Sequence, residues 1–249
     1  MDLSSRSMET EIMDDLESSG PVLDRTLREL EFINKWLGGN AVTIDALSKI
    51  MKDLPRSHTY HIVDVGCGGG DMATLIFEWG KRNGYSFMIT GVDANPNVVE
   101  YARRHVNPRN AIRFETMNIF GEEFQAMRCD ILIGTLFFHH FANDQLTNFL
   151  SWAREHVSKG VIINDIHRHP FAFHSIRILT KLFSRSPMVV NDAPLSVRRA
   201  FLRPELEDIF HNAGFDKIDI HWRWAFRWQV IARPHYGTIF TTLESNTMT

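Results

Sequence analysis

The sequence predicts an α/β protein whose sheet is mostly parallel and ends in an antiparallel hairpin. Short β-branched runs alternate with helical patterns over residues 61–164, as in a parallel sheet covered by helices on both faces. A glycine-rich turn joins the first of these strands to the helix after it. The last two strands follow each other with no helix between them, which indicates a hairpin at the sheet edge.

Two helices are expected before the sheet. Apolar residues recur at spacings of three and four over Val22–Leu37, and Gly38 and Gly39 end that pattern. A second helix, Ile44–Leu54, ends at Pro55. The acidic, polar residues 1–20 are expected to be disordered or loosely attached, so a single domain is predicted over residues 21–249, with 21–58 as its N-terminal helices.

The sheet follows from the change of period after residue 58. The predicted strands are His61–Val65, Phe87–Asp93, Ile112–Glu115, Asp130–Gly134, Gly160–Asn164, Lys217–His221 and Phe226–Ala232. The predicted helices between them are Asp71–Lys81, Asn97–His105, Asp144–Val157 and Leu206–Ala213.

Residues 166–205 are too many for a simple connection and are interpreted as an inserted helical cap. Its apolar stripe, which includes Phe171, Ile178 and Leu182, is interpreted as core and not as membrane contact.

Composition and charge exclude several classes of protein. The net charge of -3 lacks the basic footprint of nucleic-acid binders, and the clean alternation of residues 221–228 indicates a half-buried strand and not a stacking platform. Two cysteines cannot form a disulfide framework, and neither a targeting segment nor a long apolar run is visible. We therefore expect a cytoplasmic protein without stable membrane insertion. Its 18 Phe and 6 Trp against 4 Tyr suit a pocket for a flat apolar ligand.

The most informative motif is the loop VDVGCGGGD at residues 63–71, which follows a strand and opens a helix. A dinucleotide fingerprint would place its third glycine at Asp71, where a carboxylate would repel a pyrophosphate, so NAD and FAD are disfavoured. The second strand ends in Asp93, an acid that can accept hydrogen bonds from both hydroxyls of a ribose. A glycine loop and a ribose acid without room for pyrophosphate suit S-adenosylmethionine (SAM).

At these residues the chain resembles the class I SAM-dependent methyltransferases. The resemblance rests on VDVGCGGGD (63–71), GVDANP (91–96), CDILIGTLFFHHF (129–141) and AGF (213–215), and it covers about residues 60–234. It implies a Rossmann-like fold of seven strands, six of them parallel. Within that family the sequence is most similar to small-molecule methyltransferases of the quinone and polyketide type, including enzymes associated with type III polyketide synthases, which implies a role in secondary metabolism.

The resemblance also implies the cofactor-binding residues. Asp64 would lie near the amino group of SAM, Gly66, Cys67 and Gly68 would pack against the cofactor, and Asp93 and Ala94 would hold the ribose and flank the adenine. Asn118 is the best match for the residue that accepts the adenine amino group. Thr135 and Leu136 would supply the backbone beside the sulfonium.

Histidines at the carboxyl ends of the strands are the candidate bases for an oxygen acceptor. His140 follows the fourth strand, and His167 and His169 follow the fifth, with Asp165 placed to orient one of these imidazoles. The spacing of Asp165, His167 and His169 would also permit a metal site, but no further carboxylate set accompanies them, and no metal is predicted.

The predicted function is therefore SAM-dependent methylation of a small aromatic or polyketide-derived acceptor, more readily at oxygen than at carbon, by a monomer or homodimer. The alternatives are C-methylation of a quinol-like ring, SAM binding without transfer, and a NAD-dependent Rossmann enzyme. The sequence names neither the acceptor nor which histidine is the base.

Overall fold

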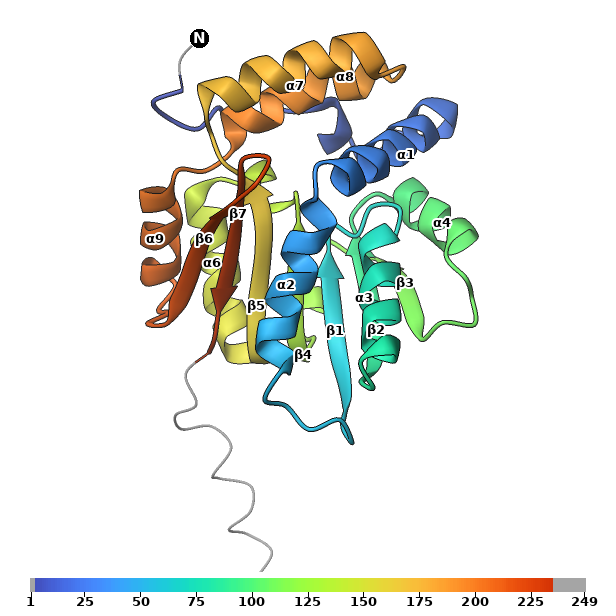
Figure 1. The fold of residues 1–249 in the computed structure, drawn as a ribbon, viewed down its shortest axis with the longest axis vertical. Helices are drawn as coiled ribbons and strands as arrows, with labels where there is room; N and C mark the ends of the chain where they lie inside the picture. Colours follow the sequence, from blue (N-terminus) through green and yellow to red (C-terminus); the bar gives the residue numbers. More distant parts are fainter. Residues whose placement is uncertain (1–2, 235–249) are drawn as a thin grey trace, which may run out of the picture.

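A computed structural model describes residues 3–234. It contains a seven-stranded sheet in the order β3-β2-β1-β4-β5-β7-β6 (Figure 1). Its strands are β1 (Thr59–Val65), β2 (Ser86–Asp93), β3 (Ile112–Thr116), β4 (Cys129–Thr135), β5 (Val157–Ile166), β6 (Ile218–Arg223) and β7 (Arg227–Ala232). The first five strands pair in parallel, and β7 runs antiparallel to both β5 and β6. The predicted fold class, the seven strands and the C-terminal hairpin are confirmed.

Two apolar layers cover the sheet because successive strand residues point to opposite faces. On β1, Ile62 packs in the layer under α2 (Gly39–Met51), α3 (Asp71–Arg82) and α4 (Pro96–His105). Its neighbour Val63 packs in the other layer, under α6 (Asn143–His156), α9 (Arg203–Asn212) and the short α5 (Glu122–Gln125). The strand interiors are therefore buried on both faces, and the ligand site is left to the strand ends.

The predicted cap is present as two helices, α7 (Pro170–Phe183) and α8 (Pro187–Arg199). With α1 (Gly20–Trp36) they lie across the carboxyl ends of the parallel strands (Figure 1). A parallel bridge between His167 and Phe201 closes the base of the cap. The cap thereby encloses the edge of the sheet at which open α/β proteins bind ligands.

The apolar stripe of α7 differs from the prediction that it forms core. The exposed fractions of Phe171, Ile178 and Leu182 are 67, 58 and 69%. Among the residues of α7, only Ala172 and Thr180 are buried. An apolar period shows which residues share a helix face but not what covers that face, and no described element covers this one.

The N-terminal segment differs from the expected loose attachment as well. Residues 12–14 form the short helix η1, and the Asp192 carboxylate on α8 accepts the backbone N–H groups of Ile12 (2.9 Å) and Met13 (3.0 Å). Glu9 pairs with Arg198 at 2.6 Å, and Glu11 is only 6% exposed. The acidic residues that suggested a solvated tail thus pair with basic and polar groups of α8. The extent of the domain to residue 249 stays a prediction, because residues 235–249 lie outside the described part of the chain.

No helix within residues 3–234 is long and apolar enough to cross a membrane.

Candidate active site

The glycine loop between β1 and α3 forms one wall of a large cavity under the cap. Gly66 and Gly68 have φ of +64° and +52°, a region that favours glycine. A Cβ on Gly66 would lie 2.1 Å from the Phe137 ring, whereas one on Gly68 would meet no atom closer than 4.0 Å. The Gly68 N–H donates to Asp93 Oδ2 at 3.4 Å, and this hydrogen bond connects the loop to the end of β2.

All nine residues that the resemblance assigns to the cofactor line this cavity of about 850 Å³. They are Asp64, Gly66, Cys67, Gly68, Asp93, Ala94, Asn118, Thr135 and Leu136. The structure therefore brings together every predicted cofactor residue, although the role of each stays a prediction. Leu136 has φ of +53°, rare for a residue with a side chain, and such strained backbone occurs preferentially at functional sites.

The end of the cavity beside the glycine loop is acidic, and two of its carboxylate oxygens lack a hydrogen-bond partner among the described residues. Asp64 Oδ2 and Asp71 Oδ2 are buried without a hydrogen-bond partner among the described residues. Burial raises the pKa of Asp64 well above its usual range and that of Asp71 to about 6. Burial also raises the pKa of Asp93, against the hydrogen bonds that its carboxylate accepts. A positively charged ligand at this end would relieve the cost of burying these three carboxyls.

A histidine–aspartate pair lies on the other side of the cavity. Asp165, fully buried at the end of β5, accepts a hydrogen bond from His139 Nδ1 at 2.7 Å. Its second oxygen accepts the backbone N–H groups of Phe138 and His139. Burial opposes ionisation of Asp165, but the nearby charge of His139 and these hydrogen bonds hold its pKa below its usual value. In the neutral ring, a proton on Nδ1 leaves a lone pair on Nε2.

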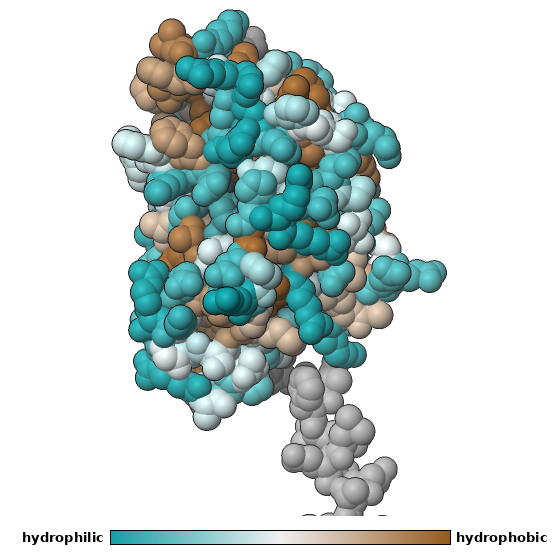
Figure 2. Space-filling view, turned by 90° about the vertical axis from the view of Figure 1, so that its right-hand side faces the viewer, coloured by the Kyte–Doolittle hydropathy of each residue, from teal (hydrophilic) through white to brown (hydrophobic). Residues whose placement is uncertain are grey.

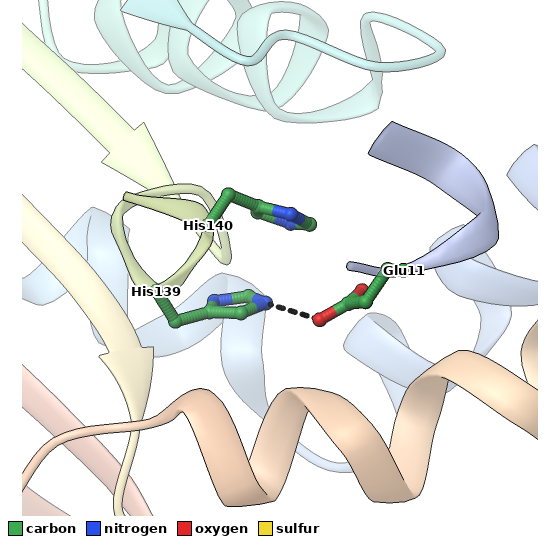
Figure 3. A group of neighbouring side chains, drawn as sticks. All are labelled: Glu11, His139 and His140. Carbon is green, nitrogen blue, oxygen red and sulfur yellow. Dashed lines mark ion pairs between the residues drawn. The ribbon is translucent and has the colours of Figure 1, made fainter. Parts of the chain in front are cut away.

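Nothing among the described residues bonds to that lone pair. His139 is 3% exposed and its Nε2 has no hydrogen-bond partner; the nearest carboxylate oxygen, Glu11 Oε1, is 3.6 Å away (Figure 3). Burial raises the pKa of Glu11 to about 7, although His140, Arg199 and a hydrogen bond from Ser196 favour its charged form. Glu11, with a carboxyl whose pKa lies near neutral pH, thus faces His139 at the cavity wall.

Of the predicted catalytic residues, the structure brings Asp165 and His140 to this place. His140 lines the cavity, but its Nδ1 bonds to Asp14 at 2.6 Å, and Asp14 also pairs with Arg199 at 2.5 Å. Burial alone would raise the pKa of Asp14, but His140 and Arg199 outweigh that effect and hold the pKa far below its usual range.

The structure places His167 and His169 outside the cavity. His167 packs against the Trp228 ring, with centroids 4.9 Å apart, and its Nδ1 is buried without a partner. His169 caps α7, accepting the Phe171 N–H at Nδ1, and stacks on Phe226. Their expected part in catalysis has no support in this geometry, because the chain turns outward after β5 to build the cap.

The sequence predicts that His139 faces the pocket beside His140, but it assigned no catalytic role to His139 and did not select Glu11. The signal for His139 was present: it precedes His140 after β4, and Asp165 ends the neighbouring strand β5. Nothing near Glu11 in the sequence points to the site, since it contacts residues more than 120 positions away.

The metal reading of Asp165, His167 and His169 does not fit, since Asp165 is bound to His139. In residues 3–234, one group, Glu11, His139 and His140, has donor atoms within 4.8 Å of one another. The two imidazole rings are tilted by 34°, with centroids 4.3 Å apart, and Nδ1 of each ring is already paired with an aspartate. We assign no metal to the group.

Comparison with known proteins identifies the kind of domain. Residues 62–160 match the methyltransferase domain family. Malonyl-[acyl-carrier protein] O-methyltransferase from Acetivibrio thermocellus is 28% identical over 131 residues, which cover 48% of this chain and 42% of that protein. The chain therefore spans less than half the length of this curated relative.

Solved methyltransferases share the fold. Human N-acetylserotonin methyltransferase, solved with SAM, gives a TM-score of 0.61 at 17% identity, covering 91% of this chain and 59% of that one. The plantazolicin methyltransferase, solved with S-adenosylhomocysteine, gives 0.61 at 14% identity, covering 85% and 90%. The match to the methyltransferase domain family and the shared fold agree with the predicted resemblance to class I SAM-dependent methyltransferases, and SAM is the cofactor that this domain implies.

Proposed function

We propose that this methyltransferase domain transfers a methyl group from SAM to a hydroxyl oxygen of a small aromatic or polyketide-derived acceptor, with His139 as the general base. One observation carries the proposal: His139, whose Nε2 has no hydrogen-bond partner among the described residues, lines the same cavity as the acid-lined glycine loop. A buried imidazole oriented by a carboxylate is the usual arrangement for removing a hydroxyl proton near neutral pH.

The loop end of the cavity fits SAM by charge and by shape. When bound, SAM supplies an electrophilic methyl group on a positively charged sulfur. The Asp93 carboxylate is positioned to accept hydrogen bonds from the ribose, and the free oxygens of Asp64 and Asp71 complement the cofactor's positive charges. The missing side chain at Gly66 makes room for the Phe137 ring, and the space beside Gly68 is open.

The remainder of the cavity suits a flat apolar molecule. Aromatic residues from four separate segments line it: Phe120, Phe137, Phe141, Phe171, Trp224 and Phe226. Such rings contribute dispersion contacts to a planar ligand and exclude water from the reacting atoms. Its volume of about 850 Å³ lies within the range of ligand pockets, which is about 300–1,000 Å³.

The pair Glu11 and His139 defines where the acceptor hydroxyl would lie. The acceptor hydroxyl would lie within hydrogen-bond distance of both His139 Nε2 and Glu11 Oε1, two atoms that are 3.6 Å apart. There the hydroxyl donates its proton to Nε2, and Glu11 can donate to the oxygen while protonated. SAM, when bound, would supply the methyl group to this oxygen, and Asp165 would stabilise the imidazolium that proton removal leaves on His139.

Incubation with deuterated-methyl SAM and cell extract, followed by mass spectrometry and NMR of the labelled product, tests the proposal. We expect a methyl ether, and we expect the His139→Ala variant to bind SAM without forming it. The His169→Asn variant is the matched control, because it removes an imidazole outside the cavity and keeps a helix-capping side chain.

A labelled methyl on carbon, or full activity of His139→Ala, would contradict the assigned role of His139. SAM binding without any labelled product would favour the binding-module alternative. The cytoplasmic location and the monomeric or homodimeric state stay predictions.

A further inference from the structure

Large apolar side chains are exposed together at the cap end of the molecule. They belong to α1, to α7 and to the turn between β6 and β7. We call them the α1–α7 surface: Phe32, Trp36, Phe171, Ile178, Leu182, Phe183 and Trp224. Figure 2 shows hydrophobic residues gathered at the upper end of the molecule, the end at which Figure 1 places α1 and α7. Contiguous exposed apolar residues of this kind mark an interaction site.

A crevice runs between the two helices of this surface. It has a volume of about 190 Å³, and its walls include Phe32 and Trp36 from α1 and Phe183 from α7. Ile33 on α1 and Ile176 on α7 line both this crevice and the large cavity. The α1–α7 surface is therefore continuous with the wall of the candidate active site.

Along the cap itself the charged side chains beside the apolar ones are all positive, although Glu29 of α1 also lines the crevice. Residues 170–191 contain no Asp or Glu, whereas Arg177, Lys181 and Arg185 are exposed. None of these three side chains forms an ion pair with another of the described residues. Exposed cations without partners beside an apolar face complement an anionic surface.

We propose that the α1–α7 surface docks this protein on the interface of an anionic lipid bilayer. An amphipathic helix with Phe and Leu on one side and Arg and Lys beside them lies in the plane of a bilayer interface. Tryptophans such as Trp36 and Trp224, about three quarters exposed, are enriched at that depth. A second copy of the chain fits less well, because a symmetric contact centred on α7 would bring the same cations together.

Sedimentation of the full chain with phosphatidylcholine vesicles, with and without phosphatidylglycerol, tests the proposal. We expect binding only to the anionic vesicles, and we expect added salt to weaken it because the cations are screened. The double variant Arg177→Gln/Lys181→Gln should bind about 25-fold more weakly, since each cation near an anionic surface contributes about fivefold. Leu182→Ser/Phe183→Ser should also bind more weakly, because it removes apolar contact.

Two matched controls lie at the other end of the molecule. Lys52→Gln/Lys81→Gln removes the same charge, and Met88→Ser removes another exposed apolar side chain; both should bind as the wild-type does. Thermal unfolding of every variant reports whether the fold is kept, independently of methyl transfer.

Equal binding to neutral and anionic vesicles, or equal binding by the α7 variants and the controls, would overturn the proposal. It would also be overturned by a dimer in analytical ultracentrifugation that Leu182→Ser/Phe183→Ser dissociates, because the surface would then be a subunit interface.

Discussion

Substitution of Asp165 by asparagine should abolish the basicity of His139 while leaving the fold and the cofactor site in place. Asp165 Oδ2 accepts two backbone N–H groups, at 2.9 and 3.1 Å, whereas Oδ1 accepts one backbone N–H and His139 Nδ1. In Asp165→Asn the amide oxygen would face the two donors, so the NH₂ group would face His139. His139 Nδ1 must then accept, and the proton moves to Nε2, which loses its free lone pair.

The size of the effect follows from the contacts. Loss of a general base lowers kcat by about 10²–10⁴, which is about 3–5 kcal/mol of barrier. The Ile166 N–H loses its acceptor, so the free energy of unfolding should fall by about 1–3 kcal/mol, which leaves most of the protein folded. SAM affinity should stay unchanged, because Asp165 does not line the cavity.

The assay is the initial rate of S-adenosylhomocysteine formation with the acceptor identified as above, measured against pH. The deficit should shrink at high pH, where a phenolic acceptor loses its proton without help. Asp130→Asn is the control, because Asp130 also accepts a backbone N–H, from His61, but at the opposite end of the sheet. A folded Asp165→Asn variant with the kcat and pH profile of the wild-type would refute the reasoning.

Three further results are expected. Asp93→Ala should raise the Kd for SAM about 10- to 100-fold in calorimetry, because it removes charged hydrogen bonds to the ribose; an unchanged Kd would contradict the cofactor assignment. Gly66→Ala should lower Tm and SAM affinity far more than Gly68→Ala, since only the first places a Cβ against Phe137, and equal effects would argue against that contact. The raised pKa of Glu11, about 7, means that the folded state binds the extra proton, so its stabilising contribution is complete below about pH 4.5 and is lost as pH rises through 7. Glu11→Gln should therefore flatten the fall in urea-unfolding free energy between pH 5 and 8, by up to about 3 kcal/mol; parallel curves for the two proteins would count against a buried, protonated Glu11.

The sheet and the cofactor wall could be predicted from the sequence because they depend on local signals. Alternating strand and helix patterns fixed the order of the elements, and Asp64, Gly66 and Asp93 lie at strand ends, where the topology brings them together. The strand predicted at Gly160–Asn164 is shorter than the observed β5, Val157–Ile166, but this difference does not change the order of the strands.

The acceptor side could not be predicted because it depends on contacts between distant segments. Glu11 reaches the site because Asp192, on α8, accepts the first N–H groups of η1. No local pattern in the sequence encodes that contact. His139 and His140 are adjacent in one turn, and sequence does not show which ring meets Asp165. Periodicity grouped Phe171 with Leu182 correctly, but it did not show that their common face is uncovered.

The closure of the cavity by residues 6–14 has a consequence for how acceptor specificity can change. The proposed proton-accepting pair comes from the short helix Phe138–His140 after β4 and from the end of β5, whereas Glu11 lies on a segment held by side chains of α8. Recognition and proton removal therefore depend on different parts of the chain, which meet where Arg6 and Arg199 donate to the His139 carbonyl. Grafting a different N-terminal segment, together with the facing positions of α8, should change which acceptors bind. His139 and Asp165 would remain in place to remove the proton.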